Sequence, residues 1–191
     1  MPEPDAVREI TSSRVLRALS HPLRRRLLDA LAVDGPSTVS TLADRTGQAV
    51  GNVSHHLKVL DEAQLVVEAP ERARDRRERW WQLAASSLSW STRAFAGSES
   101  EAAVAEAATL LNLEHQLAKV RAWMAQSETA EPTWVDAAFA SDFWLQLTPA
   151  ELAELSHELV ALLERWRTRE RDEDAERRSV FVFARGMPAS P

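Results

Sequence analysis

The chain has 191 residues, 45% hydrophobic content, a formal net charge of −6 and no cysteine. Its length suits one elaborate domain or two small ones with a real core, and the absence of cysteine excludes disulfides and thiol redox sensing. No apolar stretch is long enough to cross a bilayer and the acidic start does not resemble a signal peptide, so we expect a cytoplasmic protein without a membrane partner.

The first informative pattern is a pair of short helices. A helical pattern begins near Val39, continues from Leu42 to Arg45, and is followed by Gly47. Glycine can take positive φ at a helix end, and a second helical pattern starts within a few residues. Two helices joined so tightly cross at a steep angle, which predicts a helix-turn-helix.

The second helix of the pair is predicted to be amphipathic. Its apolar residues recur at spacings of three, four and three, which places on one core-facing stripe Val50, Val53, Leu57 and Leu60. The opposite, polar face carries Gly51, Asn52, Ser54, His55 and Lys58. A small residue allows close approach to a duplex, while hydroxyl, imidazole and ammonium groups can contact phosphates or base edges. Taken alone, this pattern fits an ordinary amphipathic helix as well as it fits a recognition helix.

A hairpin with basic residues at its tip is predicted next. Residues 65–69 and 80–83 have strand character, and the intervening stretch is rich in arginine. The five arginines of this stretch are Arg72, Arg74, Arg76, Arg77 and Arg79. A planar guanidinium can enter a narrow minor groove or clamp phosphate oxygens. Interleaved acidic residues also allow a solvated charged loop, but the position directly after a helix-turn-helix favours a wing.

In this order, the segments resemble the ArsR-type winged helix-turn-helix transcriptional repressors. The resemblance covers residues 11–83 and rests on ALSHPLRRRLLDAL (18–31), NVSHHLKVLDEAQLV (52–66) and ERWWQLA (78–84). It implies a dimeric repressor whose recognition helices enter successive major grooves of double-stranded DNA. It also implies DNA contacts by Ser54, His55 and Lys58, and backbone contacts by Arg45 and the wing arginines.

The chain departs from the family pattern at three points. Ala49 stands where the family has a hydroxyl N-cap, so the first amides of the recognition helix lack a side-chain partner that a phosphate could replace. Gln48 and Gln64 stand where the family has an apolar residue and a glycine. With no cysteine, the thiolate metal site of the arsenic and cadmium sensors is absent.

No other metal site or cofactor is expected. His55 and His56 are adjacent on a helix and project about 100° apart, so they cannot both bind one ion without distortion. His115 and His157 lie on separate predicted helices and have no second histidine three or four residues away. His21, just before Pro22, is predicted to help begin a helix. A shared site across a dimer stays open.

The second half of the chain has a different charge balance. Residues 1–93 carry 14 Lys and Arg against 12 Asp and Glu, a net +2, whereas residues 94–191 carry 9 against 17, a net −8. DNA would repel the acidic half, so it should serve another purpose. We therefore divide the chain into a DNA-binding domain at 1–93 and a dimerisation or effector region at 94–191.

A long helix over residues 99–127 offers a seam for another helix. Its apolar residues at spacings of three and four are Leu110, Leu113, Leu117, Val120 and Met124. The resembled family pairs such a helix with its twin, often together with the first helix, which would add Val15, Leu16 and Leu19. We favour this homodimer over packing of the seam within one chain.

The rest of the chain is predicted to form a small α+β appendage. Residues 142–147 and 180–184 have strand character and could pair. Between them, Thr148, Pro149 and Glu151 form a capping box, and the helix they begin runs to about residue 171 with one apolar stripe. The mixed-charge run at 167–178 is predicted to be a solvated helix tail and loop.

Aromatic residues are concentrated between positions 120 and 166. Those that could line a pocket for an apolar or aromatic small-molecule effector are Trp123, Trp134, Phe143, Trp144 and Trp166. The same residues could equally be core material. The fold class is therefore mainly α with a small β wing, followed by a helical dimerisation region and the α+β appendage.

These patterns predict a sequence-specific DNA-binding regulator, a dimeric repressor, and not an enzyme. The sequence has no glycine-rich phosphate loop, no cysteine nucleophile and no GxSxG motif. A winged helix used only for protein contact keeps the same fold and loses the DNA. Loss of duplex binding with rising salt would separate these two functions.

Overall fold

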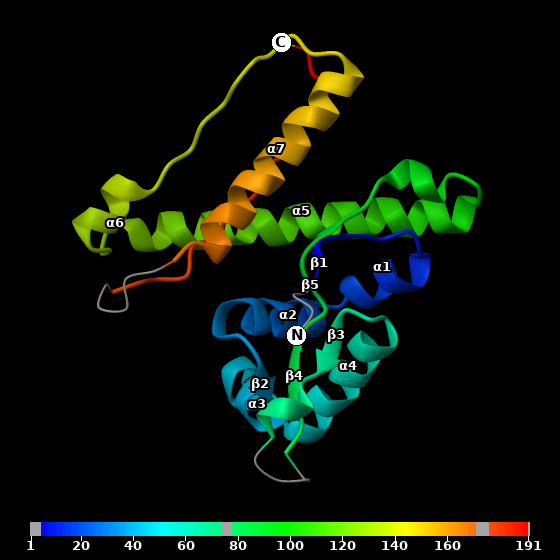
Figure 1. The fold of residues 1–191 in the computed structure, drawn as a ribbon, viewed down its shortest axis with the longest axis vertical. Coiled ribbons are helices and arrows are strands. Elements are labelled where there is room, and N and C mark those ends of the chain that lie inside the picture. Colours follow the sequence, from blue (N-terminus) through cyan, green and yellow to red (C-terminus); the bar gives the residue numbers. More distant parts are fainter. Residues whose placement is uncertain (1–4, 74–77, 171–175, 191) are drawn as a thin grey trace. The chain divides into compact units, whose positions relative to one another are not determined.

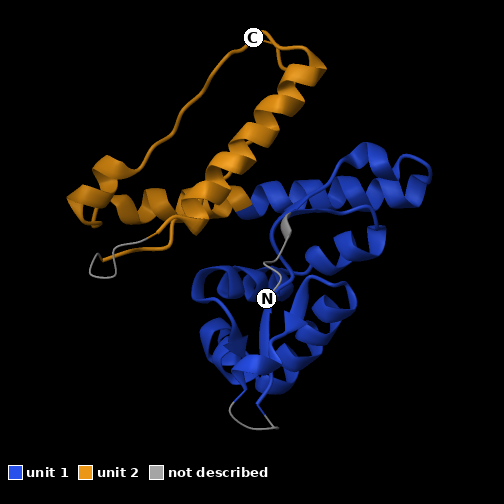
Figure 2. Ribbon diagram, viewed as in Figure 1, with its two compact units in different colours: residues 1–115 blue, residues 116–191 orange. Residues whose placement is uncertain are grey.

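A computed structural model describes residues 5–73, 78–170 and 176–190. The chain divides into two compact units, residues 1–115 and residues 116–191 (Figure 2). One helix, α5 (Glu99–Ser127), belongs partly to each unit. The functional division at 93/94 expected from the sequence stays a prediction.

Four short helices build most of the N-terminal unit: α1 (Ser13–Leu19), α2 (Pro22–Asp34), α3 (Val39–Thr46) and α4 (Val50–Glu62) (Figure 1). His21 begins α2 as expected, because its Nδ1 accepts a hydrogen bond of 3.2 Å from the Leu23 N–H. Gly47 ends α3 at φ 64°. The predicted helix-turn-helix is therefore present, with its turn at the predicted glycine.

The wing is an antiparallel hairpin of β3 (Val66–Glu68) and β4 (Trp80–Leu83). A two-residue strand, β2 (Ser37–Thr38), pairs with the other edge of β4. The strand order is therefore β2-β4-β3. The hairpin predicted at 65–69 and 80–83 is confirmed.

Two further features lie next to the wing. The sequence patterns did not reveal either of them. Strand β1 (Asp5–Glu9) pairs in parallel with β5 (Ala85–Ser89). Single 3-10 turns follow β3 and β5, at Pro70–Arg72 and Thr92–Phe95. The β1–β5 pair ties the start of the chain to the segment that leads from the wing into α5.

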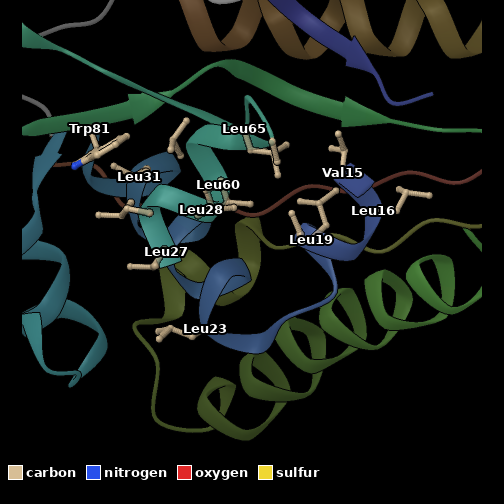
Figure 3. Packing of buried hydrophobic residues seen from close by; sticks show 14 of the residues in the cluster. Val15, Leu16, Leu19, Leu23, Leu27, Leu28, Leu31, Leu60, Leu65 and Trp81 are labelled. Carbon is tan, nitrogen blue, oxygen red and sulfur yellow. The ribbon is translucent and has the colours of Figure 1, made fainter. Parts of the chain in front are cut away.

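The core of the N-terminal unit is made by the inward faces of its four short helices, with contributions from the wing (Figure 3). Leu16, Leu27 and Leu57 are completely buried in it, and Trp81 of β4 is almost so. Side chains of this size each contribute about 1.5–3 kcal/mol when removed from water. The geometry of the helix-turn-helix is thus fixed by tertiary packing.

The first half of α5 packs against the N-terminal unit through small side chains. Ala105 and Ala108 are buried, and three polar contacts accompany them. Ser13 Oγ donates to Glu101 Oε1 at 2.8 Å, and Arg25 donates to Asn112 Oδ1 at 2.6 Å. His115 Nε2 lies 3.1 Å from Asp29 Oδ2. The predicted span of this helix, 99–127, is confirmed.

The C-terminal unit contains the end of α5 together with α6 (Pro132–Ala137) and α7 (Pro149–Thr168). The predicted capping box is confirmed: Thr148 Oγ1 accepts from the Glu151 N–H at 3.3 Å, and Glu151 accepts from the Thr148 N–H at 2.7 Å. The helix ends at Thr168, three residues before the predicted end.

The two strands predicted in this unit are wrong. Residues 142–147 and 180–184 have no regular secondary structure. Among the described residues, no backbone hydrogen bond joins either segment to another part of the chain. A strand needs a neighbour to complete its ladder of hydrogen bonds, and neither segment has one among the described residues. The appendage is helical, with extended connecting segments.

Candidate nucleic-acid interface

Helix α4 has one buried and one exposed face. Val53, Leu57 and Leu60 are each 0% exposed and anchor the helix in the core. Val50, predicted on the same stripe, is 51% exposed, because as the first residue of the helix it lies beyond the core that the later turns cover. The opposite face presents to solvent all five predicted contact residues: Gly51, Asn52, Ser54, His55 and Lys58.

The N-terminus of α4 has unsatisfied hydrogen-bond donors. Ala49 makes no side-chain cap, as expected, and the first backbone hydrogen bond that enters the helix runs from the Val53 N–H to the Ala49 carbonyl at 3.1 Å. The N–H groups of residues 50–52 therefore lack a partner within the helix. Together with the positive end of the helix dipole, they make this end suited to a phosphate oxygen.

Gly51 is not required by the packing of the protein itself. It lies in a regular helix, and a Cβ added there would meet no atom within 4 Å. A side chain at this position would instead project from the exposed face into the space that a ligand would occupy. This openness agrees with a surface that approaches another molecule closely.

Two of the predicted contact residues outside the wing already have intramolecular partners. Arg45 Nε lies 3.0 Å from Asp34 Oδ2, and its side chain is half exposed. Asn52 Nδ2 donates to Gln48 Oε1 at 3.0 Å. Both groups remain at the surface, so either can exchange its partner for a phosphate or a base edge at small cost.

Two described arginines of the wing lie on either side of its tip. Arg72 and Arg79 are exposed. Arg79 forms an ion pair with Glu68 on the facing strand, and its guanidinium lies 5.3 Å from the ring centre of Trp81. The hydrogen bond that Arg79 donates to the Glu68 carboxylate raises the pKa of Arg79. The other three predicted wing contacts, Arg74, Arg76 and Arg77, lie outside the described residues.

A histidine pair on the inner side of α4 was not anticipated. His56 is buried, and its ring centre lies 4.4 Å from that of His21 at the start of α2. Its Nδ1 is buried without a hydrogen-bond partner among the described residues. Burial, followed by the charges of His21, Arg24 and His55, lowers the pKa of His56. Burial and Arg24 likewise lower the pKa of His21, so both rings are held neutral at pH 7.

The residues predicted to form a dimer contact fall into two groups. Val15, Leu16 and Leu19 are buried in the core of their own N-terminal unit. On α5, Leu113 and Leu117 are half-buried, whereas the exposed positions are Leu110, Val120 and Met124. These three α5 positions are therefore accessible at the surface, the three α1 positions already have intramolecular contacts, and the dimer contact stays a prediction.

The aromatic residues predicted to line an effector pocket do not enclose a cavity. Trp134 is half-buried, and the other four are exposed: Trp123, Phe143, Trp144 and Trp166. Two cavities of the described residues are lined by other side chains. One, of about 200 Å³, lies between α1, α2 and α4; the other, of about 420 Å³, lies along α7.

The described part of the chain contains neither a cluster of metal ligands nor a membrane-spanning helix. No group of three or more histidine and acidic side chains there has the geometry to hold a metal ion. None of the helices in that part of the chain combines the length and the apolar character needed to cross a membrane.

Comparison with known proteins agrees with this geometry. Residues 19–69 match the family model of a helix-turn-helix domain. Those residues contain α2, α3, the turn, α4 and the first strand of the wing. The family match confirms the predicted helix-turn-helix, and the β3–β4 hairpin of the structure supplies its wing. No curated protein matches the chain.

Solved structures similar to the chain include three bacterial proteins. The homodimeric winged helix-turn-helix DNA-binding domain of Mb0332 from Mycobacterium bovis, described as a possible ArsR-family regulator, shares 23% identity over 57% of this chain and 79% of its own, with a TM-score of 0.35. Rv0081 from M. tuberculosis shares 24% identity over 61% and 90%, with a TM-score of 0.33. The transcriptional regulator Tm0710 from Thermotoga maritima shares 17% identity over 82% and 85%, with a TM-score of 0.33. The assignment of the domain rests on the family model.

Proposed function

We propose that this chain, which carries a helix-turn-helix domain at residues 19–69, is a cytoplasmic transcription regulator that binds double-stranded DNA in a sequence-specific manner as a homodimeric repressor. The observation that carries the proposal is the outer face of α4, where Ser54, His55 and Lys58 are all exposed while the inner face is locked in the core. A helix anchored on one side and polar on the other can enter a major groove without unfolding its domain.

The contacts divide into those that position the protein and those that select sequence. Lys58 and the free amides at the start of α4 suit phosphate oxygens, which carry no sequence information. Ser54 and His55, one turn into the helix, suit base edges. The arginines of the wing and Arg45 suit the flanking backbone or minor groove.

A dimer accounts for specificity in a domain with so little net positive charge. Residues 1–93 carry only +2, so nonspecific attraction to DNA is weak, and two linked recognition helices gain selectivity by contacting two half-sites. The exposed positions of α5, Leu110, Val120 and Met124, are the surface we assign to the twin helix. Occupation of a promoter by such a dimer would repress transcription. Without cysteine, a thiolate metal site cannot regulate it.

The decisive experiment is a binding titration of the full chain with a duplex from its own promoter region at increasing salt. Lys58→Ala should weaken binding to every sequence and reduce the salt slope by about 0.9, the value for one phosphate contact. His55→Ala should leave the slope unchanged and relax the preference at one base pair by about 1–3 kcal/mol. Lys119→Ala, which removes an ammonium from α5, is the matched control and should change neither quantity.

The same titration also distinguishes DNA binding from the alternative function, a winged helix that contacts only another protein. Binding that does not fall with salt, or falls equally for all three variants, would contradict the assigned interface. Absence of any duplex binding by a folded dimer would favour a winged helix that contacts another protein.

A further inference from the structure

The C-terminal unit exposes an aromatic segment that no described part of its own chain covers. Residues 138–147, here called the arm, connect α6 to α7 as an extended trace (Figure 1). Phe139, Phe143 and Trp144 of the arm are 79%, 80% and 70% exposed. Among the described residues, no hydrogen bond joins the backbone of 139–147 to another part of the chain. Large apolar groups on an extended segment of this kind mark a contact surface.

Helix α7 has an uncovered apolar face in the same unit. A cavity of about 420 Å³ runs along it, lined by Leu155, Leu159 and Leu162, with Ala161 between them. Every residue that lines this cavity belongs to α7 itself, so no other element closes it. Glu158 and Arg165 are the two charged residues on its border.

The arm and this face complement each other in chemistry. Asp142 is the only charged residue of the arm, and Arg165 is the basic residue beside the leucines of α7. Placing Asp142 near Arg165, away from Glu158, would set the direction in which the arm lies across the helix. The aromatic side chains on either side of Asp142 would then fill the apolar cavity.

The exposed area also agrees with a second copy as the occupant. Aromatic side chains present about 150–250 Å² each. At their observed exposures, the three aromatics of the arm and Trp166, which is 60% exposed, leave about 400–700 Å² of aromatic surface per copy. With the leucines of α7, this approaches the roughly 800 Å² per partner of a standard interface. A twofold dimer would use the arm and the cavity twice.

We propose that the arm of one copy packs across α7 of a second copy, with Asp142 beside the partner's Arg165, so that the two C-terminal units exchange arms. This inference rests on the homodimer of the proposed function and adds to it a specific interface outside α5. The exchange closes the α7 cavity and buries the aromatic residues that are exposed in a single chain.

Sedimentation equilibrium of the full chain tests the exchange. The unmodified chain should be a dimer, and Phe143→Ser combined with Trp144→Ser should raise the dimer dissociation constant by about 100-fold or more, because two buried aromatics are lost. Val33→Ser removes an apolar side chain that is 49% exposed but lies in α2. It is the matched control and should leave the dissociation constant unchanged.

A charge-reversal cycle tests whether Asp142 contacts Arg165 of the second copy. It also keeps the proposal testable if the double serine variant does not fold. Asp142→Arg and Arg165→Asp should each weaken the dimer by about tenfold, and their combination should recover most of that loss, because only the combination restores an opposite pair. These surface substitutions leave the apolar groups intact. If the losses of dimer affinity in the two single variants simply add in the combined variant, Asp142 does not pair with Arg165 and the proposed register is wrong.

The outcomes separate this inference from the proposed function. A dimer that is insensitive to all these variants would overturn the arm exchange and leave the DNA-binding dimer standing. A chain that stays monomeric at all accessible concentrations would overturn both the exchange and the dimeric part of the function. An arm that instead binds a small apolar molecule or another protein, with the chain monomeric, would overturn the exchange as well.

Discussion

The two units of the chain treat their apolar residues in opposite ways. In the N-terminal unit, the large side chains of α1, α2 and α4 are buried against one another. In the C-terminal unit, neither α6 nor α7 has a buried residue, although α7 has a complete apolar stripe. The N-terminal unit therefore buries its apolar side chains within the chain, whereas the C-terminal unit leaves large apolar side chains at its surface, a feature typical of contact surfaces.

The largest change in the free energy of unfolding is expected when one leucine is changed to alanine in the N-terminal unit and compared with a leucine in the C-terminal unit. Leu57→Ala should destabilise the chain by about 2–5 kcal/mol at every protein concentration, because it leaves a cavity in the core. Leu162, which is 40% exposed, should cost little within a single chain when changed to alanine. If α7 is covered by a second copy, however, the cost should depend on protein concentration. Urea denaturation at two widely separated concentrations measures both.

The histidine pair provides a second test, confined to the N-terminal unit. The pKa values of His21 and His56 are lowered in the folded chain, so the unfolded chain binds more protons as the pH falls below the ordinary value of about 6.5. The folding free energy they contribute is therefore fully present above that pH and is lost progressively on acidification. Denaturation curves between pH 5 and 8 should show this loss.

His56→Phe should flatten that pH dependence, because a ring that does not titrate takes the place of one that does. His157→Gln, which changes an exposed histidine on α7, is the matched control and should keep the slope of the unmodified chain. An unchanged slope in the His56 variant would show that other groups cause the acid sensitivity.

A smaller, stabilising effect is expected at Gln64. This residue has φ 56°, in the left-handed region that glycine adopts freely, and its position is the one where the resembled family has glycine. Gln64→Gly should stabilise the chain by about 0.5–1 kcal/mol, after allowing for the entropy that glycine adds to the unfolded state. Gln64→Ala keeps a Cβ and should bring no such gain. Thermal denaturation of the two variants decides between them.

The smallest effect concerns the ion pair of Arg45. Asp34→Asn should change the folding free energy by less than about 1 kcal/mol, because the pair is exposed. The same change frees Arg45 for phosphate and removes a nearby negative charge, so DNA binding should become tighter and its salt slope steeper by up to about 0.9. An unchanged slope would remove Arg45 from the interface.

The sequence was sufficient where local signals and packing agree. The glycine after α3, the three-and-four spacing of Val53, Leu57 and Leu60, and the Thr148 capping box each specify a local geometry, and all three occur as predicted. The polar face of α4 followed from the same spacing, because residues that are not on the buried stripe of a helix must face outward.

Sequence patterns failed where the outcome depends on distant parts of the chain. Residues 142–147 and 180–184 have strand composition, but composition does not supply a neighbouring strand. The parallel pairing of β1 with β5 joins segments about 80 residues apart, and nothing local signals it. The contact of His56 with His21 likewise joins two helices, and the helical spacing that keeps His56 off the polar face of α4 does not identify its partner.

The backbone N–H groups at the uncapped start of α4 can report whether a phosphate is bound there. Amides without an acceptor exchange their hydrogens with solvent rapidly, so the N–H groups of residues 50–52 should exchange fast in the free protein, unlike those of Val53 and Leu57 deeper in the helix. A bound phosphate would accept those hydrogens and slow their exchange. Deuterium uptake at residues 50–52 would then report whether a phosphate occupies this end of α4, with no dye or tag attached to the protein.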